Sequence, residues 1–94
     1  MIKSFANKDT QQVYERKVPK GYSAELAKRA RDKLILIDQA EDLEELRIPL
    51  GNRLEKLKGD RKGRHSIRIN AQYRVCFGWE GRDAYEVEIV DYHG

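Results

Sequence analysis

Residues 66–90 read SIRINAQYRVCFGWEGRDAYEVEIV, and their pattern decides the fold. Apolar side chains recur at every second position in three runs, at 67–69, 73–79 and 85–89. A period of two is typical of strands that have one buried face. The polar segments between the runs, NAQ and EGRD, each have the composition of a hairpin turn. The stretch therefore predicts three consecutive antiparallel strands.

The predicted register brings two arginines together. If NAQ forms a three-residue turn, Arg68 lies directly across from Arg74 on the polar face of the sheet. Like charges in this arrangement destabilise a sheet by roughly a few tenths of a kcal/mol. Either a carboxylate of the last strand, Glu86 or Glu88, neutralises the pair, or a bound anion does.

Two helices are predicted upstream of these strands. Asp9, followed by Gln12 three residues later, resembles a capping box and predicts a short helix over Thr10–Lys17. Ser23 is the N-cap of a longer helix, in which apolar residues recur at helical spacing. The apolar positions of that stripe are Leu26, Ala30, Leu34 and Ile37.

Two short strands complete the predicted elements, one at residues 2–5 and an edge strand around Leu54 and Leu57. Helices come first and an antiparallel sheet follows, which is an α+β arrangement. The length of 94 residues predicts a single domain that spans 1–94. His65 shares its strand parity with Ile67, so we expect it to line the edge of the core.

Composition and length narrow the classes of protein. No apolar run approaches the ~20 residues of a membrane span, and the N-terminal residues lack the apolar segment of a signal peptide. We therefore expect a cytoplasmic protein with no membrane partner. Cys76 is the single cysteine, and the His and acidic residues lack metal-ligand spacing. Neither a metal nor another cofactor is expected.

Positive charge is concentrated in residues 52–74. This segment holds eight basic and two acidic side chains, a formal balance of +6, although the whole chain is only +3. Such a concentration costs free energy through self-repulsion, and its usual purpose is to bind a polyanion such as a nucleic-acid backbone. The basic residues are Arg53, Lys56, Lys58, Arg61, Lys62, Arg64, Arg68 and Arg74.

The C-terminal residues Asp91, Tyr92 and His93 bring proton-transfer groups to the end of the last strand. Histidine has an unperturbed pKa of about 6.5, which suits proton transfer near neutral pH. RNA is cut without a metal when its 2′-OH loses a proton, attacks the adjacent phosphorus and expels the 5′-oxygen. This reaction needs a base, an acid and cations at the phosphate, and Arg74 and Lys58 are candidate cations.

Three segments carry a family resemblance: the opening MIKSF, the segment GNRLEKLKGDRKGRHSIRINAQYRVCF and the closing EIVDYH. Together they resemble the HigB branch of the RelE/ParE toxin superfamily, which comprises toxins of bacterial toxin–antitoxin modules. The resemblance implies a RelE-like fold, with two N-terminal helices packed on a small antiparallel sheet that has a mixed edge. It also implies a ribosome-dependent mRNA endoribonuclease that enters the decoding site of the small subunit.

The resemblance also assigns roles to residues. It implies that Lys58 and Arg74 stabilise the phosphate and that His93 transfers protons. Asp91 and Tyr92 are implied to orient the substrate or share the proton transfer, with Tyr92 also stacking on a base. The basic residues implied to contact RNA are Arg53, Lys56, Arg61, Lys62, Arg64 and Arg68.

Glu55 departs from the pattern of some relatives, which have a catalytic histidine just ahead of the L-K-G-D-R segment. A carboxylate, with a normal pKa of about 4.3, is a poorer base at neutral pH unless it is desolvated. Either Glu55 acts with a raised pKa, or His93 carries more of the proton transfer, or the enzyme is a mild one.

The resemblance implies a protein partner, a cognate HigA-like antitoxin with a helix-turn-helix domain, and contact with DNA only through the complex with it. Two other functions use the same fold or charge: a non-catalytic inhibitor of DNA gyrase, and a basic ribosome-binding module. The terminal Tyr92–His93 pair favours the ribonuclease, because neither alternative requires it.

Overall fold

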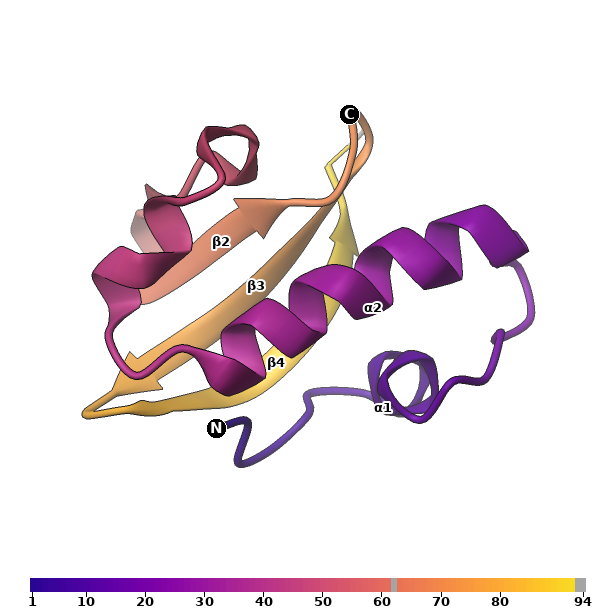
Figure 1. The fold of residues 1–94 in the computed structure, drawn as a ribbon, viewed down its shortest axis with the longest axis horizontal. Helices are drawn as coiled ribbons and strands as arrows, with labels where there is room; N and C mark the ends of the chain where they lie inside the picture. Colours follow the sequence, from indigo (N-terminus) through magenta and orange to yellow (C-terminus); the bar gives the residue numbers. More distant parts are fainter. Residues whose placement is uncertain (62, 93–94) are drawn as a thin grey trace.

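The computed structural model describes residues 1–61 and 63–92, without the side chain of Arg61, and has the predicted α+β arrangement (Figure 1). Helix α2 lies across one face of a four-stranded sheet, and α1 lies beside it. The helices are α1 (Lys8–Tyr14) and α2 (Ala24–Gln39), and the short 3-10 helices are η1 (Leu43–Arg47), η2 (Leu50–Asn52) and η3 (Gly59–Arg61). The strands are β1 (Glu55–Lys56), β2 (Arg64–Arg68), β3 (Tyr73–Glu80) and β4 (Asp83–Asp91).

The sheet has the order β1-β2-β3-β4, and all its neighbouring strands are antiparallel. The predicted register of the first hairpin is confirmed, since Arg68 pairs with Arg74 and Ser66 pairs with Cys76. The turn of the second hairpin is confirmed by the pairing of Glu80 with Asp83.

The alternation of buried and exposed side chains is interrupted in β4. The register with β3 shifts between Cys76 and Gly78, and Glu86 has a positive φ of 48°. This irregularity changes the parity of the strand, so that both Ala84 and Val87 are fully buried although they lie three positions apart.

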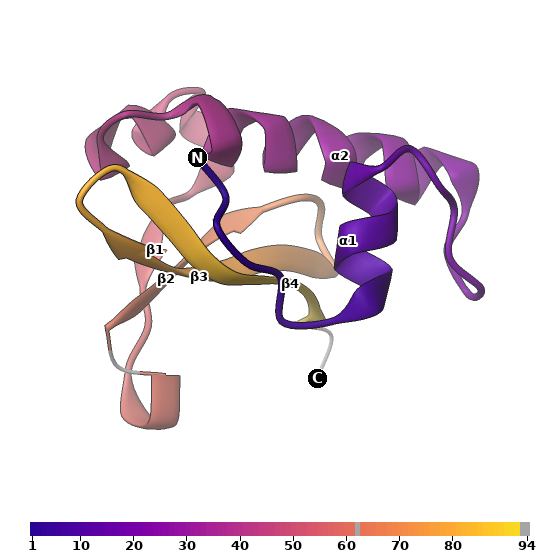
Figure 2. The same ribbon diagram turned by 90° about the horizontal axis from the view of Figure 1, so that it is seen from below.

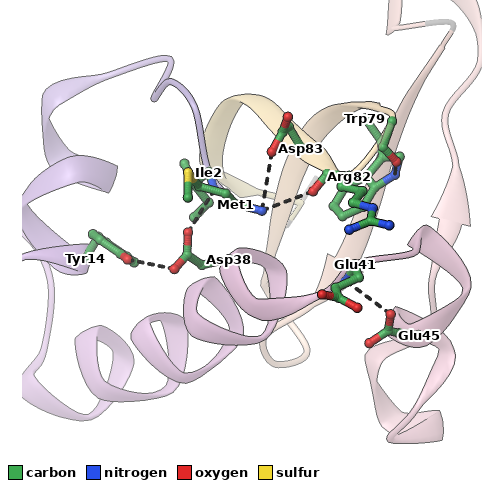
Figure 3. Close-up of polar contacts among 10 residues, drawn as sticks. Met1, Ile2, Tyr14, Asp38, Glu41, Glu45, Trp79, Arg82 and Asp83 are labelled. Atoms are coloured by element: carbon green, nitrogen blue, oxygen red, sulfur yellow. Dashed lines mark hydrogen bonds and ion pairs between the residues drawn. The ribbon is translucent and has the colours of Figure 1, made fainter.

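The predicted N-terminal strand at residues 2–5 is reduced to two isolated bridges. Ile2 and Phe5 bridge to Ala84 and Val87 of β4 in the parallel direction, which gives the sheet its mixed edge. Figure 3 shows how the terminus is held: the Met1 ammonium donates to the carbonyl of Arg82 at 3.1 Å.

Asp38 joins this N-terminal segment to both helices (Figure 3). Its carboxylate accepts from the backbone N–H of Ile2 at 2.8 Å and from the hydroxyl of Tyr14 at 3.1 Å. Burial, together with the hydrogen bond to Asp38, raises the pKa of Tyr14. One carboxylate of α2 therefore links α1 and the N-terminal segment, both of which contact β4.

Helix α2 forms as predicted. The hydroxyl of Ser23 accepts from the backbone N–H of Leu26 at 3.0 Å, and the four residues of the apolar stripe are buried. They pack on the inner face of the sheet, where Val75, Phe77 and Val87 are fully buried. None of the helices in the described residues is long and apolar enough to cross a membrane.

The predicted bounds of α1 were wrong at both ends. Asn7, with an extended backbone, is the N-cap, and its side chain accepts from the N–H of Thr10 at 2.8 Å. Asp9 instead lies in the first turn, where a carboxylate favours the positive end of the helix dipole. The helix ends at Tyr14 rather than Lys17, because Arg16 turns to a φ of 71°.

The edge strand predicted around Leu54 and Leu57 is observed as the two-residue strand β1. Arg53 follows η2 in the left-handed conformation (φ 45°, ψ 58°), so β1 begins at Glu55, opposite Ser66. The strand therefore does not extend along Arg68, and that part of the sheet edge faces η2 instead.

His65 lies at the edge of the core, as predicted. It is partly buried, and its ring lies 6.0 Å from that of Phe77. Burial lowers the pKa of His65, and the positive charge of Lys56 lowers it further. Both effects favour the neutral imidazole.

Candidate active site

Arg74 is the centre of a polar cluster on the face of the sheet opposite α2. Val75 and Phe77 enter the core, so the alternation of β3 directs Arg74 and Cys76 to the other face. Arg74 is nevertheless buried, with only 8% of its surface exposed, because neighbouring groups surround its guanidinium. Arg74 is a buried cation, and its guanidinium donates hydrogen bonds to several acceptors.

The acceptors come from β2 and from the residue after η2. The Nε of Arg74 donates to the hydroxyl of Ser66 at 2.8 Å, and Nη2 donates to the carbonyls of Arg53 at 2.5 Å and Ser66 at 3.4 Å. Ser66 is completely buried. Because the acceptors lie on different segments of the chain, they fix both the position and the plane of the guanidinium.

Glu55 is the acidic partner of this arginine. Its Oε1 lies 3.8 Å from Nη1 of Arg74, and the Glu55 side chain is 56% exposed. The expectation that Glu86 or Glu88 neutralises the arginine pair was wrong for Arg74. Glu88 pairs instead with Arg64 at 3.9 Å, and the irregularity at Glu86 brings its carboxylate to Ser4.

Tyr92 covers the guanidinium from the C-terminal end. The Cζ of Arg74 lies 5.8 Å from the centre of the Tyr92 ring, within the range of a cation–π contact. The hydroxyl of Tyr92 lies 3.8 Å from Sγ of Cys76, and its backbone N–H donates to Gln72 at 2.7 Å. The structure thus brings Arg74 and Tyr92 together while leaving the tyrosine 42% exposed.

Asp91 lies at the end of β4, beside the NAQ turn. It pairs with Tyr73, and its carboxylate accepts from the side-chain amide of Gln72 at 3.2 Å. The turn itself is held by the side chain of Asn70, which accepts from the backbone N–H groups of Gln72 and Tyr73 at 2.8 Å each. The end of β4 is therefore fixed to a rigid turn within one residue of the Arg74–Tyr92 contact.

Taken together, these contacts make a partly exposed site with one fixed guanidinium, one phenol and the two carboxylates of Glu55 and Asp91. A guanidinium with a defined plane suits a planar or tetrahedral oxyanion such as a phosphate. In the described part of the chain, no group of three or more His, Cys, Asp and Glu side chains is placed to hold a metal ion.

Comparison with known proteins identifies the family. Residues 3–93 match the family described as RelE-like toxin of type II toxin-antitoxin system HigB. The chain belongs to this family. It is 39% identical over 93 residues to Endoribonuclease HigB of Proteus vulgaris, with 99% of this chain and 100% of the relative covered. It is 40% identical over 84 residues to Toxin HigB-1 of Vibrio cholerae serotype O1, with 84% of each covered.

Solved structures share the fold of this chain. A YafQ mutant from E. coli matches with a TM-score of 0.61 at 11% identity, over 98% of this chain and 92% of that one. The YoeB–YefM complex from Staphylococcus aureus matches with a TM-score of 0.63 at 19% identity, over 100% and 99%. The predicted RelE-like fold is confirmed, and as a member of a type II family the toxin has an antitoxin partner.

Other predicted site residues of the toxin are placed by contacts outside the Arg74 cluster. Lys58 and Lys56 line a cavity of about 300 Å³ with Leu57 and Gly59, and η3, which follows, projects from the sheet edge away from α2 (Figure 2). Within residues 1–61 and 63–92, the contacts gathered at Arg74 do not include Lys58.

Arg64 is turned toward β4, where it donates to the carbonyl of Glu86 at 2.8 Å. Three predicted groups, the side chain of Arg61, Lys62 and His93, lie outside the described residues.

Sequence reasoning missed two groups that hold the arginine in this toxin. The sequence did contain a signal for Ser66, because the predicted register places it on the same face as Arg74, two pairs along the ladder from the Arg68–Arg74 pair. No sequence pattern predicts the contact with the carbonyl of Arg53, because this carbonyl reaches the site only through the left-handed turn after η2.

Proposed function

We propose that this toxin is a metal-independent mRNA endoribonuclease that acts on the translating ribosome. The 2′-OH of the message loses a proton and attacks the adjacent phosphorus, and the bond to the 5′-oxygen breaks as that oxygen gains a proton. The products are a 2′,3′-cyclic phosphate and a 5′-OH. The observation that carries the proposal is the buried guanidinium of Arg74, fixed by Ser66 and Arg53 on the face of the sheet opposite α2.

Arg74 is proposed to stabilise the phosphate as its negative charge increases in the transition state. Its Nε and Nη2 are held by Ser66 and Arg53, whereas its Nη1 faces a mostly exposed carboxylate at 3.8 Å. Such a long, exposed ion pair contributes little to stability. A phosphate oxygen can therefore replace Glu55 at Nη1 without the arginine having to move.

Proton transfer is assigned to the C-terminal residues. His93 is proposed as the main proton-transfer group, and Asp91 and Tyr92 orient the substrate or share the transfer, with Tyr92 also stacking on a base. Glu55 is retained as the alternative base. Proton transfer of this kind contributes about 10²–10⁴ in rate. Lys58 is proposed to reach the same phosphate when the segment that precedes η3 is in contact with RNA.

The remaining cations are proposed to bind ribosomal RNA and the message backbone, without reading sequence. They are Arg53, Lys56, Arg61, Lys62, Arg64 and Arg68. Translating ribosomes imply action in the cytoplasm. The antitoxin is proposed to be HigA-like and to carry a helix-turn-helix domain, so that DNA is contacted only by the complex.

The test is primer extension on a message translated with purified ribosomes. Wild-type toxin is expected to produce new 5′ ends within the coding region, whereas Arg74→Ala should produce none and still pellet with ribosomes. Arg82→Ala is the matched control, because Arg82 is an exposed arginine at the β3–β4 turn. If the wild-type protein leaves the message intact, or if Arg74→Ala cleaves like wild type, the proposal is wrong. Trapped gyrase–DNA breaks would then identify the gyrase-inhibitor function.

A further inference from the structure

A second cluster of cations lies beside the Arg74 site, around a cavity of about 340 Å³. The cavity lies between α2 and the end of β2. Arg29 and Lys33 contribute from α2 and Arg68 from β2, with Asp32, Gly51 and Ile69 completing the lining. Arg29 and Lys33 fall outside the basic segment at residues 52–74, so the charge pattern of the sequence does not reveal this cluster.

The two α2 cations, of which Arg29 is exposed and Lys33 is half-buried, are each anchored by a hydrogen bond. A guanidinium nitrogen of Arg29 donates to the carbonyl of Ile69 at 3.3 Å, and the ammonium of Lys33 donates to the side-chain carbonyl of Asn52. Asn52 is completely buried and in turn donates to the carbonyl of Leu46 at 3.1 Å. Each cation keeps further N–H donors beyond the one used for anchoring.

The charge around the cavity is unbalanced. Three cations line it against the single carboxylate of Asp32, and Asp32 is exposed. Burial lowers the pKa of Lys33, and the neighbouring charge of Arg29 lowers it further, whereas Asp32 opposes both effects. Like charges held this close cost free energy in the isolated protein, and a bound anion removes that cost.

The position of the cavity relates it to the candidate active site. Arg68 pairs directly with Arg74, and residues in such pairs have Cα atoms roughly 4.5–5.5 Å apart. The η2 segment serves both sites: Asn52 anchors Lys33, and the next residue, Arg53, supplies the carbonyl that holds Arg74. The cavity therefore lies within one strand pair of Arg74, close enough for neighbouring phosphates of one RNA strand to reach both.

We infer that this cavity is a second phosphate-binding site, in which Arg29, Lys33 and Arg68 hold a phosphodiester group of RNA. The inference rests on the proposed function, because it takes RNA as the ligand. The phosphodiester belongs either to the message, next to the bond that is cut, or to ribosomal RNA, and the chemistry of recognition is the same.

The test compares two double variants with equal loss of charge. Arg29→Gln with Lys33→Gln neutralises the cavity, and glutamine keeps an N–H donor for Ile69 and Asn52. Lys20→Gln with Lys28→Gln is the control, because both lysines are exposed and lie outside the cavity lining. Thermal unfolding of both proteins establishes that they fold. Arg68→Gln, on a different element, tests the cavity independently if the first variant fails to fold.

Binding is measured over a salt series with two probes, a 2′-O-methyl hexanucleotide that resists cleavage and salt-washed vacant ribosomes. Loss of one phosphate contact should weaken binding about tenfold and reduce the salt slope on the single strand by about 0.7. A loss on the hexanucleotide without a loss on vacant ribosomes identifies the message as the source of the phosphate, and a loss on vacant ribosomes identifies ribosomal RNA. The control variant should change both affinities much less.

If the cavity variants bind both probes as tightly as the control variant does, the inference is wrong, even if the wild-type toxin cleaves the message. If wild-type toxin binds RNA and never cleaves it, the proposed nuclease function is wrong, and loss of binding in the cavity variants still supports the second site. The two failures are therefore distinguishable.

Discussion

Replacing Ser66 by alanine tests whether Arg74 is held in place by the sheet. The hydroxyl of Ser66 accepts from Nε of Arg74 at 2.8 Å, and both residues are buried. A hydrogen bond to a charged group contributes about 1.5–3 kcal/mol. The carbonyls of Arg53 and Ser66 remain as acceptors in the variant, so we expect a loss near or just below the lower end of that range, about 1–2 kcal/mol.

For a chain of 94 residues this loss lowers the melting temperature by roughly 4–15 °C. Cleavage of a translated message should fall about tenfold or more, because misplacement of a transition-state contact by a fraction of an ångström is costly. Urea unfolding and primer extension measure the two effects. Ser4→Ala is the matched control, since it removes an exposed hydroxyl that contacts Glu86.

A double-mutant cycle with Arg74→Gln separates the direct contact from general destabilisation. If Ser66 acts through Arg74, the two substitutions should be strongly non-additive in both stability and activity. Wild-type stability together with wild-type cleavage in Ser66→Ala would refute the reasoning, because the buried guanidinium would then be positioned without that hydroxyl.

Three further outcomes are expected from other parts of the fold. Because folding lowers the pKa of His65, the unfolded chain binds its proton more readily, and stability should fall as the pH drops below about 6.5. His65→Gln should show a shallower fall in melting temperature between about pH 7 and 5.5, and parallel curves would contradict this. Tyr92→Leu should lose about 0.5–1 kcal/mol in urea unfolding, whereas Tyr92→Phe keeps the ring on Arg74 and should lose less. Leu34→Ala should cost about 2–5 kcal/mol, because Leu34 is completely buried against the sheet; a loss below 1 kcal/mol, on the order of a conservative core change, would mean that the helix is loosely packed.

The sequence predicted the elements whose signals are local. The period of two and the NAQ turn were sufficient for the register that pairs Arg68 with Arg74. Ser23 and the apolar stripe were sufficient for the start and the buried face of α2. These features depend on neighbouring residues and on alternation, which a single sequence displays directly.

Features that depend on tertiary contact were not predictable. The N-cap of α1 is Asn7 rather than Asp9, and both residue types cap helices equally well in isolation. The irregularity at Glu86 has no composition signal, and it redirects the carboxylates expected near Arg74. The contact of Glu55 with Arg74 exists because Arg53 turns the chain into β1.

The candidate site was predicted in part. The sequence selected Arg74 and Tyr92, and the structure brings them together at 5.8 Å. It also selected Lys58, which comes just before η3 and lines a cavity with Lys56, Leu57 and Gly59. The cations Arg29 and Lys33 were not among the predicted site residues, because their approach to Arg68 depends on how α2 crosses the sheet.

The most direct measurement is the chemical identity of the ends produced when wild-type toxin meets a translated message. We predict a 2′,3′-cyclic phosphate on the upstream fragment and a 5′-OH on the downstream fragment, with neither formed by Arg74→Ala. Fragments that carry a 3′-OH and a 5′-phosphate, or unchanged cleavage by Arg74→Ala, would contradict the account.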